Sequence, residues 1–189
     1  MENLTDSPDV VALLLGQHRE IRSTMLKVDE AAASERGATF APLVALLAVH
    51  ETAEEIVVYP ALARSAGDEG ARVADARKAE EDEAKKMLAD LEDADPATDE
   101  FMSLFRDFRA AIEQHATAEE NEVFPLLART HSAEEMRALG AEAEVAERMA
   151  PTHGHRGAPE SASGNLLLGP FVAMADRVRD ALRGVRAPN

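Results

Sequence analysis

The sequence predicts an all-α protein: an antiparallel up-down-up-down four-helix bundle with a C-terminal helical extension. Ala, Leu and Glu dominate the 189 residues, whereas aromatic residues are only 4% and β-branched ones are few, a balance that favours helices over strands. Four long segments also place apolar residues at helical spacing, and short loops separate them, which is typical of a bundle. Hydrophobic residues make up 46% of the chain, enough for a sizeable core in one domain.

The first two helices are expected near the N-terminus. Ser7 as cap and Pro8 in the first turn mark the start of the first helix, and His18 interrupts its apolar stripe. Residues 31–39 are expected to form a loop. Residues 41–64 then form the second helix, with Leu43 and Leu47 on its inward face.

The third and fourth helices follow a glycine-containing break at residues 65–70. The third, residues 72–93, is highly charged and has a sparse inward stripe. Asp95 and Pro96 signal the start of the fourth helix, which runs to about Arg129 with a stripe rich in phenylalanine. Residues 1–130 are therefore expected to form the four-helix bundle.

Residues 131–189 are expected to form the C-terminal helical extension. Ser132 and Glu135 have the spacing of a capping box, which predicts a short fifth helix. A connection rich in Pro, Gly and His follows at about residues 150–164. Residues 166–185 are amphipathic and would pack on the bundle or form a dimer contact, so a monomer and a homodimer both stay open.

The charge and the missing cysteines narrow the classes of partner and site. A net charge of −16 disfavours nucleic acid and anionic membranes as partners. The absence of cysteine excludes disulfides, thiolate zinc sites and Cys-ligated iron–sulfur clusters, so His and carboxylates must hold any metal. No basic–apolar leader and no apolar run near the roughly 20 residues of a membrane helix is seen, and a cytoplasmic location is expected.

An internal repeat carries the chemistry. Residues 50–60 (HETAEEIVVYP) recur at residues 115–125 (HATAEENEVFP), and each copy has the form His-x-x-x-Glu. Four residues of α-helix turn through about 400° and rise about 6 Å, so the imidazole and the carboxylate project from one face. In both copies this polar pair interrupts the apolar stripe, which indicates a buried site.

Six polar side chains, at least one from each helix, are expected to face the bundle interior: His18, His50, Glu54, Glu81, His115 and Glu119. Burying several carboxylates without a partner would be very costly, so they either pair with cations or bind metal. The neighbouring basic residues, Lys85 among them, are expected on other faces. A lone inward histidine such as His18 is more often a hydrogen-bonded core residue, and a single i,i+4 pair can simply support a helix. Two matched His-x-x-x-Glu pairs favour a metal site over these structural roles.

Three further positions leave alternatives open. The phase of the third helix selects Glu81, with Glu80 as the alternative in a charged run. Tyr59 points away from Glu54 on an ideal helix and is expected to be a packing residue, unless a kink at Pro60 brings its phenol to the site as an additional ligand. His153 and His155 are expected to be exposed or hydrogen-bonded.

The pattern His … His-x-x-x-Glu … His-x-x-x-Glu over about residues 8–130 resembles the hemerythrin-like family, also called the HHE cation-binding domain. The resemblance implies a bundle with two non-heme iron ions in an oxo- or hydroxo-bridged centre. It makes His18, His50, Glu54, His115 and Glu119 ligands and Glu54 and Glu119 the bridging carboxylates.

The third helix departs from the family pattern, because Glu81 takes the position where the family usually has a histidine. Carboxylates are hard, anionic ligands that favour ferric iron, which argues against reversible oxygen carriage. The first hypothesis is therefore a di-iron protein of the oxidative or nitrosative stress response that binds O₂, peroxide or NO, with catalase-like or peroxidase-like turnover left open. The alternatives are a non-catalytic iron- or oxygen-sensing module and a structural metal site.

Overall fold

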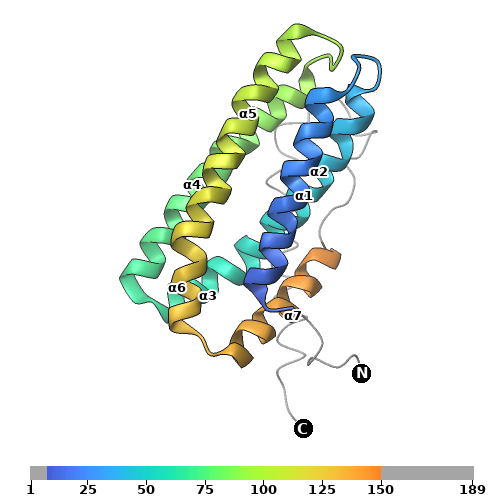
Figure 1. Cartoon of the computed structure of the whole chain (residues 1–189). Helices are drawn as coiled ribbons and strands as arrows, with labels where there is room; N and C mark the ends of the chain where they lie inside the picture. Colours follow the sequence, from blue (N-terminus) through green and yellow to red (C-terminus); the bar gives the residue numbers. More distant parts are fainter. Residues whose placement is uncertain (1–7, 150–189) are drawn as a thin grey trace.

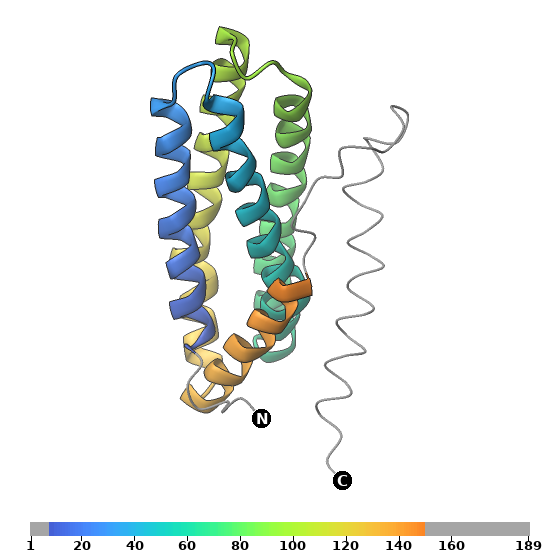
Figure 2. The ribbon, with the colours of Figure 1, turned by 90° about the vertical axis from the view of Figure 1, so that its right-hand side faces the viewer.

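The computed structural model describes residues 8–149, which are helical throughout apart from short connections and contain no strand. Long helical segments run side by side, and a further helix lies across one end of them (Figures 1 and 2). The elements are α1 (Val10–Glu30), α2 (Arg36–Ala53), the π-helix η1 (Glu54–Val58), α3 (Tyr59–Ser65), α4 (Gly67–Asp93), α5 (Asp99–Ala118), the π-helix η2 (Glu119–Val123), α6 (Phe124–Thr130) and α7 (Ala133–Met149). The predicted all-α helical bundle is confirmed.

The caps at the helix starts differ in part from those predicted. Asp9 caps α1 by accepting a hydrogen bond from the Ala12 amide at 2.9 Å, so α1 begins after Pro8; Ser7 lies outside the described residues. Thr98, rather than Asp95, caps α5. The capping box that opens α7 is confirmed, although α7 is longer than the short helix predicted, because it packs on the bundle.

Two predicted breaks are shorter in the structure. α2 begins at Arg36 and therefore includes part of the predicted 31–39 loop. α4 begins at Gly67, earlier than the predicted residue 72, because the positive φ of Gly67 (55°) makes the whole turn at this point. A β-carbon on Gly70 would lie 2.2 Å from the Leu62 carbonyl oxygen, so α3 and α4 approach closely only because Gly70 has none.

Each copy of the repeat contains a π-helical turn directly after its His-x-x-x-Glu pair. The Tyr59 amide bonds to the Glu54 carbonyl and the Phe124 amide to the Glu119 carbonyl, in place of the usual i−4 partners. Pro60 and Pro125 follow at once, and a proline ring collides with the i−4 carbonyl of a regular α-helix. The wider turn removes that conflict and shifts the residues after it by about 100°.

The polar residues of the repeat divide the hydrophobic core into two parts. One part lies toward α7 and includes Leu14, Leu62, Leu127 and Ala143. The other part lies toward the opposite end and contains Ile21, Leu43, Leu88 and the phenylalanines of α5. Within residues 8–149, no helix is long and apolar enough to cross a membrane.

The predicted C-terminal extension is described only as far as α7. This helix contacts α1, α2 and η1, so it closes the end of the bundle where α1 begins. The connection at about residues 150–164, the helix at residues 166–185, His153 and His155 lie outside the described residues.

Candidate metal centre

The bundle brings together the six side chains that the sequence singles out: His18 from α1, His50 from α2, Glu54 from η1, Glu81 from α4, His115 from α5 and Glu119 from η2. All are buried, and the most exposed of them, His115, is only 8% exposed. Glu54 and Glu119 are each the first residue of a π-helical turn, four residues after a histidine. The apolar stripes therefore predicted correctly that these six side chains are buried and lie close together.

The six residues form two groups that share Glu54. One group contains His18, His50, Glu54 and Glu119, and the other contains Glu54, Glu81 and His115; the ligand atoms within each group lie within 4.8 Å of one another. In the first group His50 Nε2 lies 3.2 Å from Glu54 Oε1, and His18 Nε2 lies 3.2 Å from Glu119 Oε2. In the second, His115 Nε2 lies 4.0 Å from both Glu54 Oε2 and Glu81 Oε1.

Several of the buried ligand atoms lack a hydrogen-bond partner. They are His18 Nε2, both carboxylate oxygens of Glu54, Glu81 Oε2, His115 Nε2 and Glu119 Oε2. A buried polar atom without a partner is costly, and a carboxylate more so. Lone pairs that converge from both sides of Glu54 fit a pair of cations, which would satisfy these atoms together.

The electrostatics of the site also fit a bound cation. Burial, reinforced by Glu119 and Glu81, raises the pKa of Glu54 well above its ordinary value, and burial also raises the pKa of Glu81. Burial lowers the pKa of His50 to about 3, so its imidazole is neutral and can act as a ligand. Burial opposes ionisation of Glu119 as well, but the adjacent imidazoles of His18 and His115 outweigh it and lower its pKa.

Each of the three histidines has a second partner at Nδ1 that turns Nε2 toward the centre. Glu120 Oε1 lies 2.9 Å from His18 Nδ1, and Glu80 Oε2 lies 3.1 Å from His115 Nδ1. His50 Nδ1 instead lies 2.7 Å from the amide oxygen of Gln17. Such outer partners fix the ring and the tautomer of a metal-binding histidine. The sequence did not predict these outer partners, although Glu80 and Glu120 directly adjoin Glu81 and Glu119.

Tyr59 reaches the site, although an ideal helix would point it away from Glu54. The π-helical turn adds one residue, so Tyr59 takes the place that the fourth residue after Glu54 would otherwise have. Its buried hydroxyl lies 2.5 Å from Glu81 Oε1 and 2.9 Å from Glu119 Oε1. The expectation of a packing residue is therefore wrong, and the alternative, in which a distorted helix brings the phenol to the site, agrees with these two hydrogen bonds. That Tyr59 binds metal stays a prediction.

The two halves of the site pair different side chains at equivalent positions. Phe124 occupies the place of Tyr59 in the second copy of the repeat, and its ring stacks on His18 with centroids 5.6 Å apart. Tyr59 instead bonds to Glu81, which holds the position on α4 that His18 holds on α1. A carboxylate thus meets a hydroxyl donor in one half, and an imidazole meets an apolar ring in the other.

α4, the third long helix of the prediction, turns Glu81 inward as expected, whereas Glu80 remains partly exposed and bonds to His115. The expectation that Lys85 lies on another face is wrong. Its Nζ lies 2.6 Å from Glu55 Oε1, 3.6 Å from Glu51 Oε2 and 3.7 Å from Glu81 Oε2. Lys85 lies four residues after Glu81 and therefore on nearly the same helix face, and its long side chain extends along that face to the carboxylates.

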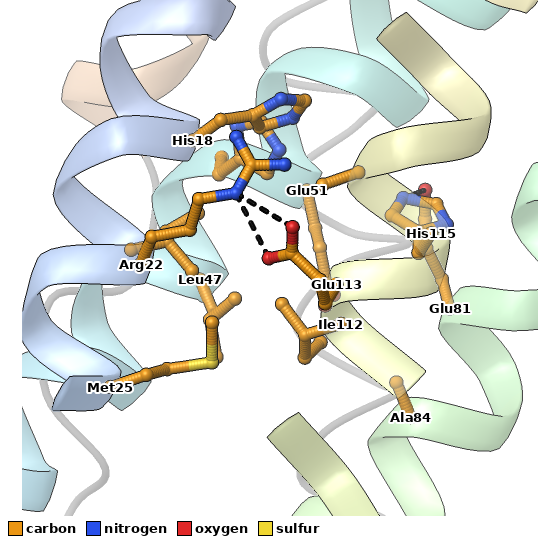
Figure 3. Close-up of a pocket in the computed structure, with 13 residues that line it drawn as sticks. His18, Arg22, Met25, Leu47, Glu51, Glu81, Ala84, Ile112, Glu113 and His115 are labelled. Carbon is orange, nitrogen blue, oxygen red and sulfur yellow. Dashed lines mark hydrogen bonds and ion pairs between the residues drawn. The ribbon is translucent and has the colours of Figure 1, made fainter. Parts of the chain in front are cut away.

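A cavity of about 20 Å³ adjoins the histidines, which is room for roughly one water molecule. Ile21, Met25, Leu47 and Ile112 contribute much of its wall, and an ion pair between Arg22 and the Glu113 carboxylate lies beside it (Figure 3). The cavity is therefore suited to a small ligand.

Metal should stabilise the protein more at high pH than at low pH. Glu54 and Glu81 have raised pKa values in the fold, so the stability they give the metal-free protein is present below about 4.5 and is lost as pH rises through the raised values. Protons also compete with metal for these carboxylates. We expect Co²⁺ to raise Tm by several degrees more at about pH 8 than at about pH 5.5. An equal shift at both values would contradict this electrostatic account.

The family model for the hemerythrin HHE cation-binding domain matches residues 9–127, which span the bundle and all six residues. The chain belongs to this family. The HHE domain binds cations, typically iron, and the buried His and Glu side chains gathered here are the candidate residues for that binding. On α4, Glu81 completes the second group.

The chain is similar to one curated protein in sequence and to one solved structure in fold. An uncharacterized hemerythrin-like protein of Schizosaccharomyces pombe is 29% identical over 136 residues, which cover 72% of this chain and 67% of the relative. The crystal structure of a hemerythrin HHE cation-binding domain-containing protein from Mycobacterium kansasii superposes with a TM-score of 0.65 at 22% identity, covering 89% of this chain and 98% of that one. This likeness shows the shared fold.

Proposed function

We propose that the protein holds two iron ions at the six clustered residues and reacts there with O₂, peroxide or NO, in a response to oxidative or nitrosative stress. The observation that carries the proposal is the pair of ligand groups that share Glu54. Both carboxylate oxygens of Glu54 are buried and lack a hydrogen-bond partner. His18, His50 and Glu119 complete one ligand set, and Glu81 and His115 complete the other. Glu119 Oε2 also lies 3.5 Å from His115 Nε2, which supports a bridging role for Glu119.

The donor set supports iron over zinc. Structural zinc is usually held by four ligands, often with thiolates, whereas this chain has no cysteine and presents six donor residues. Imidazole and carboxylate together suit iron. When bound, a pair of iron ions supplies electrons to O₂, peroxide or NO.

The surrounding residues support chemistry with a small ligand. The cavity beside His18, His50 and His115 accepts a molecule of only a few atoms. The hydroxyl of Tyr59 holds a proton between Glu81 and Glu119. Three carboxylates stabilise ferric iron, which favours reaction with oxygen species over their reversible carriage.

The proposed function is tested with iron-loaded protein and the His115→Ala variant. Elemental analysis should find two irons per chain, and peroxide decay together with stopped-flow mixing with O₂ or NO should reveal a reaction. We expect His115→Ala to slow that reaction by at least about tenfold, because it removes a ligand of the Glu81 half. His131→Ala, which changes a histidine bonded to Thr130 outside the cluster, is the control. Iron-loaded protein that reacts with none of the three ligands would overturn the proposal.

The alternative is a non-catalytic module that senses iron or oxygen. It is favoured by a hydrogen-bonded link from His50 to α7, which would report the state of the site at the end of the bundle. Slow, stoichiometric reaction without turnover would favour this alternative, whereas repeated peroxide turnover would favour an enzyme.

A further inference from the structure

One of the three histidines is supported from outside the four-helix bundle. His18 and His115 bond through Nδ1 to carboxylates of η2 and α4. His50 bonds to the neutral amide of Gln17, and Gln17 Nε2 donates to Glu147 Oε1 of α7 at 2.7 Å. We propose that α7 is a working part of the metal centre and that Glu147 is a positioning residue, which acts through Gln17 to set the orientation and tautomer of His50.

The chemistry of the amide explains why Glu147 is needed. A carboxylate only accepts hydrogen bonds, so it holds the NH₂ group of Gln17 on its own side and leaves the amide oxygen facing His50. That oxygen only accepts, so His50 must carry its proton on Nδ1. The lone pair of Nε2 then points toward Glu54 Oε1, 3.2 Å away. If the amide turned over, its NH₂ group would face Nδ1 and favour the tautomer with a proton on Nε2, which cannot bind metal.

The position of α7 is fixed tightly enough for this task. Its inward residues Leu139, Ala143 and Ala146 are buried in the core that also contains the start of α1. A β-carbon at Gly140 would lie 2.2 Å from the Pro8 carbonyl oxygen, so the two backbones are in direct contact. Close packing of α7 on α1 therefore holds Glu147 against Gln17.

The link reaches only one of the two ligand groups. His50 belongs to the group with His18 and Glu119, whereas the group with Glu81 and His115 has its own support from Glu80. Loss of Glu147 should weaken metal binding on the His50 side and leave the affinity of the group with Glu81 and His115 nearly unchanged. By linkage, metal on the His50 side should hold α7 more firmly on the bundle.

The first experiment uses the metal-free full-length protein and so does not depend on the proposed function. Nitrogen-15 NMR of the imidazole should show a proton on Nδ1 of His50 in the wild type and in Glu147→Gln, whose amide oxygen can still accept from Gln17. Glu147→Leu should show a mixture of tautomers. Glu134→Leu, an exposed position on α7, should match the wild type. Wild-type tautomers in Glu147→Leu would overturn the proposal.

The second experiment titrates Co²⁺ into the same proteins. Glu147→Leu and Gln17→Leu should each weaken one of the two binding steps by about tenfold, the lower end of the range for outer partners, and the double variant should lose no more than Gln17→Leu alone. Glu147→Gln should restore that step. Hydrogen exchange in α7 should slow on metal binding in the wild type, and it should slow less in Glu147→Leu.

Additive losses of affinity in the double variant, or equal losses at both binding steps, would contradict a link through Gln17. Wild-type protein that binds no metal would instead refute the proposed function, and the NMR result would still stand.

Discussion

Glu54→Gln is expected to abolish binding of both metal ions while leaving the metal-free protein no less stable than the wild type. Glu54 is the residue common to both ligand groups, and an amide cannot supply an oxygen of comparable charge to each ion. Its loss should weaken both binding steps by at least about 100-fold, more than the loss of an outer partner does. Calorimetric titration with Co²⁺ and iron analysis of the purified variant measure this.

The stability of the Glu54→Gln variant separates a functional site from a structural one. Burial makes the Glu54 carboxylate unfavourable in the metal-free fold, so the amide removes a cost and the Tm of metal-free protein should stay level or rise at neutral pH. Glu122→Gln, in the same π-helical turn as Glu119 but exposed, is the matched control and should bind both ions. Wild-type affinity in Glu54→Gln would mean that Glu54 is not a shared ligand.

Glu81→His is expected to raise the reduction potential of the iron centre and slow its oxidation by O₂. A neutral imidazole in place of a carboxylate removes one negative charge from a buried site, which destabilises ferric iron relative to ferrous iron. Replacing anionic ligands with histidine shifts iron potentials on the order of 100 mV or more. Spectroelectrochemical titration and stopped-flow oxidation measure the two effects.

The double variant Glu81→His with Tyr59→Phe gives the sharper result. It copies the arrangement of His18 with Phe124 into the other half of the site, and it removes the Tyr59 hydroxyl, which loses one of its two acceptors with Glu81. We expect it to bind metal better than Glu81→His alone and to keep the raised potential. Glu83→His, at an exposed position of α4, is the control. An unchanged potential in both Glu81 variants would refute the role given to this carboxylate.

The sequence was enough to predict the convergence of the six residues, because each of them interrupts an apolar stripe of known helical phase. His50 and Glu54, for example, follow Leu43 and Leu47 in that phase. The same phase distinguished Glu81 from Glu80, since Leu88 and Leu91 share the face of Glu81. Whether all six bind metal stays a prediction.

The residues that sequence reasoning missed depend on departures from regular helices or on distant contacts. Pro60 left open a kink that would bring Tyr59 to the site, but the extra residue of the π-helical turn, which is what redirects Tyr59, was not predicted. Glu120 belongs to a charged run, which usually faces solvent. Gln17 acts on His50 only because α7 docks over α1, and that docking needs close packing that periodicity does not encode.

The most direct test of the central claim is an anomalous difference map from crystals of iron-loaded protein, collected on both sides of the iron absorption edge. We predict two peaks that flank the Glu54 carboxylate, one beside His18 and His50 and the other beside Glu81 and His115, and both should vanish below the iron edge. A single peak, no peak, or signal that persists below the iron edge would contradict a two-iron centre.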